Sequence, residues 1–402
     1  FMTSHIVRNA RLSDGSYVDV HLSSGIVEKT TPHDPTAVVN EHDTDAQGQL
    51  LLPTLAEPHA HLDKAFLAER ISNPSGDLLG AIHAVHEHAH TLTFDDIVER
   101  ASRAVNIYLK NGTTRIRTHA DTFDGSTLQV RALRQVANNF RDLCDIEICA
   151  LVQWPLTGKE GKSSRLLAER ARADGADLIG GCPHLDTDPS GANKVFLALA
   201  KDLDCDLDLH VDETLNAGML SLRDLAKRVI DKAPAFSVTA SHCVSLGMQS
   251  AKVQKQVANL VASAEIAIVT LPQTNLYLQG REHQSAMPRA LTALGALRAA
   301  GATVLAGGDN LQDPFNPMGR ADPLEAAGLL VSAGHYFPGD AFDAVSSTVH
   351  QRLSGELPFL ATGANAHFIL TPAKSVREFI AFANQPRSVF RHGTLIHDTL
   401  EA

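Results

Sequence analysis

The chain has 402 residues, of which 44% are hydrophobic and 20% are charged, as in an ordinary globular protein with a large core. Its formal net charge of −11 argues against a nucleic-acid or membrane-surface partner, because both reward clustered lysine and arginine. The 5 cysteines lack Cys-x-x-Cys spacing, which indicates reduced thiols. Since residues 1–5 lack a signal-peptide pattern and no apolar stretch is long enough to span a membrane, we expect a cytoplasmic protein with small-molecule ligands.

The two ends of the chain carry short β-rich runs separated by turn signals. One set of these runs extends from Ile6 to Gly48, and a second set lies between His367 and Ile396. We therefore expect a small β-sandwich domain assembled from residues 1–52 and 358–402.

The middle of the chain, residues 53–357, alternates apolar strands with helical stretches rich in Ala and Leu, which predicts a parallel α/β architecture. The expected strands lie at Leu50 to Pro58, Arg115 to His119, Ile146 to Gln153, Leu178 to Cys182, Asp206 to Val211, Phe236 to His242, Ile266 to Leu271 and Thr303 to Gly307. Eight strands separated by helices favour a (β/α)8 TIM barrel, whose active site lies at the carboxyl ends of the strands.

Histidines and carboxylates recur where these strands end. Side chains alternate along a strand, so His59 and His61 share one face and can reach one metal ion. On strand five, His210 points into the barrel, and Glu213 follows at a distance suited to a proton carrier. The candidate metal ligands are His59, His61, His210 and Asp309, and the candidate acid–base groups are Glu213 and His242.

These motifs resemble the amidohydrolase superfamily and, within it, the bacterial cytosine deaminase branch. The matching runs are Glu57 to Asp63, Ser75 to Leu78, Gln153, Cys182 to His184, His210 to Glu213, Ser241 to His242, Asn275 to Arg281, Gly308 to Asp309 and Asp313 to Gly319. The resemblance implies one divalent metal ion, Zn(II) or Fe(II), on His59, His61, His210 and Asp309. It also implies catalytic roles for Glu213, His242 and Asp309, and substrate contacts from Gln153 and the backbone of Leu78.

The sequence departs from the cytosine deaminase pattern at three pocket positions. Lys64 replaces a small hydroxyl residue and is similar to the lysine of triazine-ring hydrolases that remove alkylamines. Asn310 replaces an aspartate, and Phe315 replaces a tryptophan. Strand four also lacks the lysine that bridges two metal ions in binuclear members of the superfamily, so we expect a mononuclear site.

The sequence thus predicts a hydrolase that deaminates a small cyclic amidine, with cytosine as the first candidate, and that releases ammonia. The alternatives are a creatinine or isocytosine deaminase, an isopropylammelide-type triazine hydrolase or lactam-opening amidohydrolase, and a metal-binding barrel without turnover. Whether the chain forms a homo-oligomer stays open. A run of histidines, His83, His86, His88 and His90, is interpreted as a solvated helix face because no strand end accompanies it.

Overall fold

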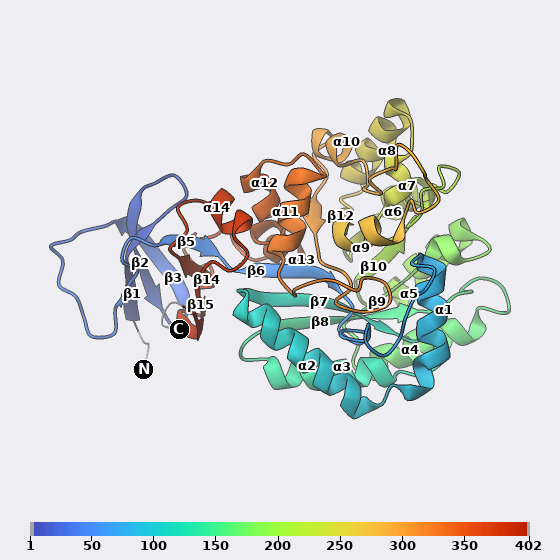
Figure 1. Ribbon diagram of the computed structural model, residues 1–402, viewed down its shortest axis with the longest axis horizontal. Helices are drawn as coiled ribbons and strands as arrows, with labels where there is room; N and C mark the ends of the chain where they lie inside the picture. The colour runs from blue at the N-terminus through green and yellow to red at the C-terminus, as the bar shows by residue number, and fades with distance from the viewer. Residues whose placement is uncertain (1–3, 400–402) are drawn as a thin grey trace.

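The computed structural model describes residues 4–399, so Phe1, Met2 and Thr3, which entered the signal-peptide expectation, lie outside it. The described residues form two eight-stranded sheets. One sheet is the barrel, and the smaller sheet lies at one end of the elongated molecule, beside both chain termini (Figure 1).

The barrel strands follow one another in chain order around the sheet, and every neighbouring pair is parallel. They are β6 (Leu55–Ala60), β7 (Thr113–Asp121), β8 (Asp145–Val152), β9 (Leu178–Gly181), β10 (Leu207–Val211), β11 (Val238–His242), β12 (Ala267–Thr270) and β13 (Val304–Ala306). A bridge between Ala60 and Asp309 closes the ring, where Asp309 N–H donates to the carbonyl of His59 at 3.0 Å. The predicted (β/α)8 barrel is confirmed.

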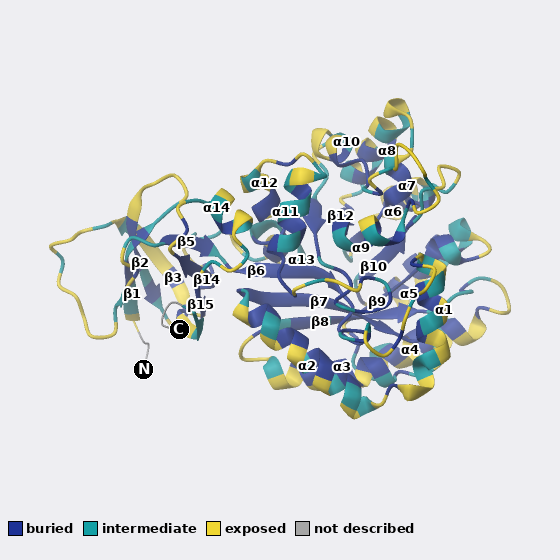
Figure 2. Ribbon diagram, viewed as in Figure 1, coloured by how far each residue is buried: buried dark blue, intermediate teal, exposed yellow. Residues whose placement is uncertain are grey.

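Helices cover the outer face of the barrel, so the strands are buried on both sides (Figure 2). They are α1 (Leu78–His88), α2 (Phe94–Lys110), α3 (Leu128–Phe140), α4 (Lys162–Ala173), α5 (Pro189–Asp202), α6 (Ser221–Lys232), α7 (Val244–Gly247), α8 (Ala251–Ser263), α9 (Pro272–Leu278), α10 (Leu294–Ala299), α11 (Leu324–Ser332), α12 (Pro338–Asp343) and α13 (Ser347–Ser354). Within residues 4–399, none of the helices combines the length and the apolar character needed to cross a membrane. The five cysteines are all buried free thiols.

The smaller sheet is built from both ends of the chain, as expected for a separate β-sheet domain. Its strands are β1 (Ser4–Arg11), β2 (Tyr17–Ser23), β3 (Ile26–Pro32), β4 (Thr44–Asp45), β5 (Leu50–Pro53), β14 (Phe368–Thr371), β15 (Ser388–Arg391) and β16 (Thr394–Asp398), with α14 (Val376–Ala381) between β14 and β15. The N-terminal and C-terminal parts meet where β5 pairs antiparallel with β14. We propose domain limits near residues 52 and 357, close to the passage from β5 to β6 and between α13 and β14.

The sequence predicted one strand from Leu50 to Pro58, and this prediction is wrong. The structure divides the run at Thr54, so that β5 pairs in the small sheet while β6 pairs in the barrel. The Thr54 hydroxyl lies 2.8 Å from the Thr114 hydroxyl and 3.2 Å from His350 Nε2, which anchors the crossing point. The apolar pattern gave no sign of the break because the residues on both sides of it are buried.

Candidate active site

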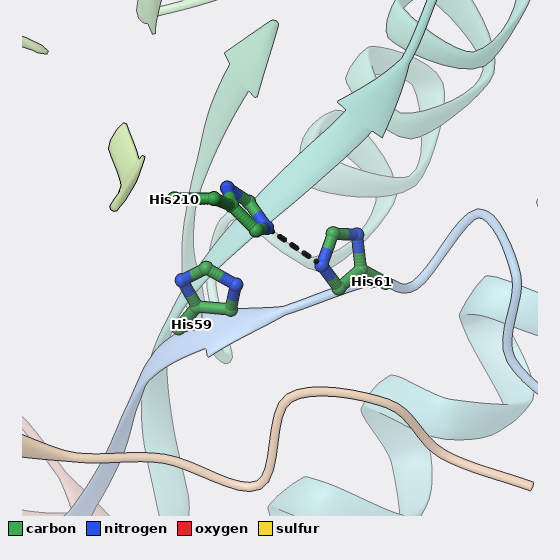
Figure 3. A group of neighbouring side chains, drawn as sticks. All are labelled: His59, His61 and His210. Carbon is green, nitrogen blue, oxygen red and sulfur yellow. Dashed lines mark hydrogen bonds between the residues drawn. The ribbon is translucent and has the colours of Figure 1, made fainter. Parts of the chain in front are cut away.

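The four candidate metal ligands converge at the carboxyl end of the barrel. His59 lies on β6 and His61 just beyond it, while His210 comes from β10 on the far side, and their rings are turned toward one another (Figure 3). The Nε2 atoms of His61 and His210 lie 3.3 Å apart. Asp309 follows β13, and its Oδ1 lies 3.3 Å from His61 Nε2 and 3.5 Å from His59 Nε2. One ring nitrogen from each of His59, His61 and His210 lies within 4.8 Å of the others, and Asp309 forms a similar group with His59 and His242.

The chemistry of this set fits a divalent cation. Buried polar atoms normally have hydrogen-bond partners, yet His59 Nε2 and both carboxylate oxygens of Asp309 find none among residues 4–399. Burial, reinforced by the neighbouring histidines, lowers the pKa of His59 and His210 well below the ordinary value. Their rings are thus neutral and can offer lone pairs. Three imidazoles and one carboxylate form a donor set that suits zinc or iron.

A chain of hydrogen bonds orients His59 from behind. Its Nδ1 donates to the Ser241 hydroxyl at 2.9 Å, and that hydroxyl donates to Asp208 Oδ1 at 3.3 Å. Arg117 donates to the other oxygen of Asp208 at 3.1 Å. With the proton held on Nδ1, the lone pair of His59 lies on Nε2, which faces the candidate metal position.

Ser241→Ala is expected to weaken metal binding without unfolding the barrel. The variant removes the acceptor that holds His59 in one tautomer, and the loss of such a partner typically lowers metal affinity by roughly 10- to 100-fold. Titration of the metal-free protein with Zn(II) under a competing chelator measures this change. Ser245→Ala, on the short helix α7 that follows β11, is the matched control and should leave the affinity unchanged. Equal affinities for the parent and Ser241→Ala would show that His59 needs no such support.

The candidate acid–base groups lie next to this position. His242 Nδ1 accepts a hydrogen bond from the Asn275 amide at 3.1 Å and lies 3.5 Å from Glu213 Oε1. This leaves the proton on Nε2, which has no partner among the described residues. Burial, together with the charge on Asp309, raises the pKa of Glu213 well above its ordinary value. Burial therefore favours the protonated form of Glu213, and His242 can donate one hydrogen bond.

Three residues here adopt left-handed backbone conformations. The φ angles are 50° at Asp212, 69° at His242 and 63° at Asp309. Such conformations are unfavourable for residues other than glycine and persist where the surroundings impose them, often at functional sites. Asp212 also accepts hydrogen bonds from the backbone N–H groups of Ser221 and Leu222, at 3.1 and 2.9 Å. The strand end therefore turns sharply, and Glu213 follows the turn into the cavity.

A cavity with a water-accessible volume of about 40 Å³ lies against these groups. Its lining includes the predicted substrate residues Lys64, Leu78, Asn310 and Phe315, together with His61, His210, Glu213, His242 and Asp309. Gln153, the fifth predicted substrate residue, does not line this cavity, whereas its neighbour Trp154 does. The sequence placed Gln153 at the carboxyl end of this strand. However, β8 ends at Val152, so the alternation of side chains along the strand does not determine where Gln153 points.

Lys64 lines the cavity and belongs to a cluster of charged side chains. Its ammonium is 3.2 Å from Asp63 Oδ2 and 3.5 Å from Asp121 Oδ2, and the side chain is almost fully buried. Burial by itself lowers the pKa of Lys64, but the charges on Asp63 and Asp121 outweigh this effect and the pKa is raised. Lys64 is therefore a fixed cation beside the substrate cavity.

The carboxylate of Asp313 orders the loop that carries Asn310 and Phe315, the other two positions at which the sequence departs from the cytosine deaminase pattern. Asp313 accepts hydrogen bonds from the Asn310 amide at 2.8 Å and from the backbone N–H groups of Phe315 and Asn316 at 2.8 and 3.1 Å. Asn310 and Phe315 are thereby held together against the cavity.

The sequence analysis missed His119 and Asp208, which form a further potential ligand group with His59. His119 is fully buried near the end of β7, and its ring centroid is 4.0 Å from that of His59. Neither ring nitrogen has a hydrogen-bond partner among the described residues, although Nε2 lies 3.8 Å from Asp208 Oδ1. Its position could have been found, because Arg115, Arg117 and His119 share the inward face of one strand.

The four clustered histidines lie on α1 and in the turn after it. His83, His86 and His90 are exposed, and none of the four belongs to a potential metal-ligand group among the described residues, which supports a solvated helix face. His86 differs from the others because its ring packs edge-to-face on Phe123, with centroids 4.8 Å apart.

Comparison with known proteins identifies the family. The model described as "Amidohydrolase family" matches residues 68–387. The chain belongs to this family. The match begins just after the His59 and His61 motif, so these two histidines support the assignment from outside the matched residues. Family membership and the buried histidine–aspartate cluster together make this amidohydrolase a metal-dependent enzyme.

Similar proteins extend over nearly the whole chain. A pterin deaminase from Rhizobium rhizogenes is 30% identical and aligns with 95% of this chain and 88% of its own. The structure of 5-methylcytosine deaminase from Klebsiella pneumoniae with phosphonocytosine is 26% identical, covers 98% of both chains and has a TM-score of 0.89. The structure of N-isopropylammelide isopropylaminohydrolase from Burkholderia multivorans is 26% identical, covers 99% of both chains and has a TM-score of 0.83.

Proposed function

We propose that this amidohydrolase deaminates a small cyclic amidine, with cytosine as the first candidate, and releases ammonia. The observation that carries the proposal is the juxtaposition of Glu213, His242 and Asp309 with three neutral histidines around one small cavity. The names of the pterin and 5-methylcytosine deaminases support a cyclic amidine. An isocytosine ring is the second candidate, because the reacting ring of a pterin is of that type.

The reaction adds water to the amidine carbon and breaks its bond to the exocyclic nitrogen. A divalent ion held by His59, His61, His210 and Asp309 would supply hydroxide at neutral pH by lowering the pKa of water. Asp309 accepts one proton of the attacking water. Glu213 gives its proton to the ring nitrogen, which makes the amidine carbon more electrophilic, and His242 Nε2–H donates a hydrogen bond to the developing oxyanion. The proton from Asp309 then passes to the departing amine, which leaves as ammonia, and the remaining proton of the water returns to Glu213 as the carbonyl forms.

We further propose that the site holds one metal ion. Strand β9 contributes Gly180 at the position that faces the barrel interior, and a Cβ atom there would lie 1.9 Å from the Asp208 carbonyl oxygen. This strand therefore has neither a ligating side chain nor room for one. The outward-facing neighbour, Gly181, is packed against Phe196 in the same way.

Release of ammonia from a panel of cyclic amidines by the metal-loaded protein tests the proposed function. Cytosine, isocytosine, pterin and creatinine should be distinguished by their rates, and the alkylamine release expected of a triazine hydrolase is assayed in parallel. Ammonia from at least one amidine supports the proposal. Release of alkylamine or of a ring-opened acid without ammonia would instead support one of the alternative amidohydrolase reactions.

Lys64→Met is expected to shift the preference among cytosine, isocytosine and creatinine while the bound metal remains. The ammonium of Lys64 favours substrates with a carbonyl oxygen on the adjacent edge, and methionine keeps most of the side-chain volume. The change also leaves Asp63 and Asp121 without their buried cation, so the protein should lose roughly 3–5 kcal/mol of stability. Steady-state kinetics, metal analysis and denaturant unfolding measure the three effects. An unchanged ranking of substrates would place the reacting ring away from Lys64.

A further inference from the structure

A second cavity lies beside the active-site cavity, and the two share Lys64 and Phe123 in their walls. The active-site cavity has a water-accessible volume of about 40 Å³, and its neighbour is larger at about 120 Å³. One water molecule needs roughly 10–15 Å³ by the same measure, so the first cavity accepts little more than one small ring. The second cavity is therefore large enough to hold a further part of a ligand.

Phe123 forms the partition between the two cavities. Its ring makes edge-to-face contacts with both Trp154 and His86, each with centroids 4.8 Å apart. Its backbone is held separately, because Phe123 N–H donates to Asp121 Oδ1 at 2.7 Å. The ring can therefore turn aside without loss of that hydrogen bond, and contacts of this kind contribute only about 0.5–1.5 kcal/mol each.

The wall of the second cavity is rich in hydrogen-bond acceptors. Gln129, on α3, lines it with only 4% of its surface exposed, and its Oε1 has no hydrogen-bond partner among residues 4–399. The carboxylates of Asp121 and Asp124 line the same space. A buried acceptor without a partner is costly, so a ligand that brings an N–H or O–H donor to Gln129 would be favoured there.

We propose that the two cavities are two parts of one binding site for a fused two-ring amidine. The reacting ring lies by Glu213 and His242, and the second ring, or a donor-bearing substituent on it, occupies the space beyond Phe123 and donates to Gln129. This inference rests on the proposed function and narrows its substrate class. It makes Phe123 and Gln129 specificity-determining residues.

Gln129→Leu and Phe123→Ala test the proposal by kinetics on cytosine, pterin and 6-hydroxymethylpterin. Gln129→Leu should lower kcat/KM for 6-hydroxymethylpterin roughly five- to tenfold, the effect of one lost hydrogen bond, and leave cytosine within about twofold. Phe123→Ala should raise the ratio of pterin to cytosine turnover by up to roughly tenfold, because no ring must be displaced. Gln135→Leu, on the exposed face of the same helix, is the matched control and should behave as the parent.

Equilibrium binding separates this inference from the proposed reaction. Trp154 is the single tryptophan of the chain and contacts Phe123, so quenching of its emission should report a pterin in the joined cavity. If no amidine is deaminated but Gln129→Leu weakens the binding of 6-hydroxymethylpterin and Gln135→Leu does not, the binding site stands and the proposed reaction fails. If cytosine is deaminated while the parent binds no pterin, or if both variants match the parent on every ligand, the two-part site is overturned.

Discussion

Asp309→Ala is expected to remove the bound divalent ion and, with it, all measurable turnover. Asp309 is the carboxylate of the candidate ligand set, and its buried Oδ1 lies 3.3 Å from His61 Nε2 and 3.5 Å from His59 Nε2. A four-ligand site loses its geometry when one ligand is removed. The backbone bridge between Asp309 and Ala60 does not depend on the side chain, so the barrel should remain folded. His61→Ala should behave in the same way.

Metal analysis of the purified variants, alongside ammonia release, measures this effect. His350→Ala is the matched control, because His350 is equally buried but contacts Thr54 at the crossing between the two sheets. It should lose stability and keep its metal. Removal of metal from the parent with a chelator should reproduce the loss of activity, and readdition of Zn(II) or Fe(II) should restore it. Stoichiometric metal and full activity in either ligand variant would exclude that residue from the site.

Glu213→Gln is expected to retain the metal and to lose roughly two to four orders of magnitude in kcat, the usual contribution of a positioned proton carrier. The amide keeps the shape of the side chain but cannot deliver a proton to the ring nitrogen. Burial and the charge on Asp309 raise the pKa of Glu213, which favours the protonated carboxyl that this step requires.

This prediction is tested by measuring the metal content and the rate of ammonia release of each purified variant. Glu282→Gln makes the same chemical change on an exposed surface loop and should match the parent in both. If Glu213→Gln loses its metal in proportion to its activity, Glu213 is a ligand instead of a proton carrier. If it keeps both metal and rate, the proton reaches the ring by another route.

The parts of the site that the sequence predicted depend on local geometry. Strand alternation put Asp208 and His210 on one face of β10, and the structure places Leu207, Leu209 and Val211 of the same strand in the hydrophobic core. In a parallel barrel all strands end at the same rim, so residues that finish different strands must converge. For this reason His59, His210 and Asp309 could be grouped although they are far apart in the sequence.

The tertiary structure decided what depends on contacts between distant segments. The break at Thr54 arises because two different sheets compete for one apolar run, and no local pattern records that competition. Trp154 replaces Gln153 in the cavity wall because the chain has left the strand, where side chains no longer alternate. The charge environment of Lys64 is likewise set by Asp121, which only the pairing of β6 with β7 brings near. Residue type and strand period thus determined the chemistry of this protein, whereas packing between distant segments determined the shape of its cavity.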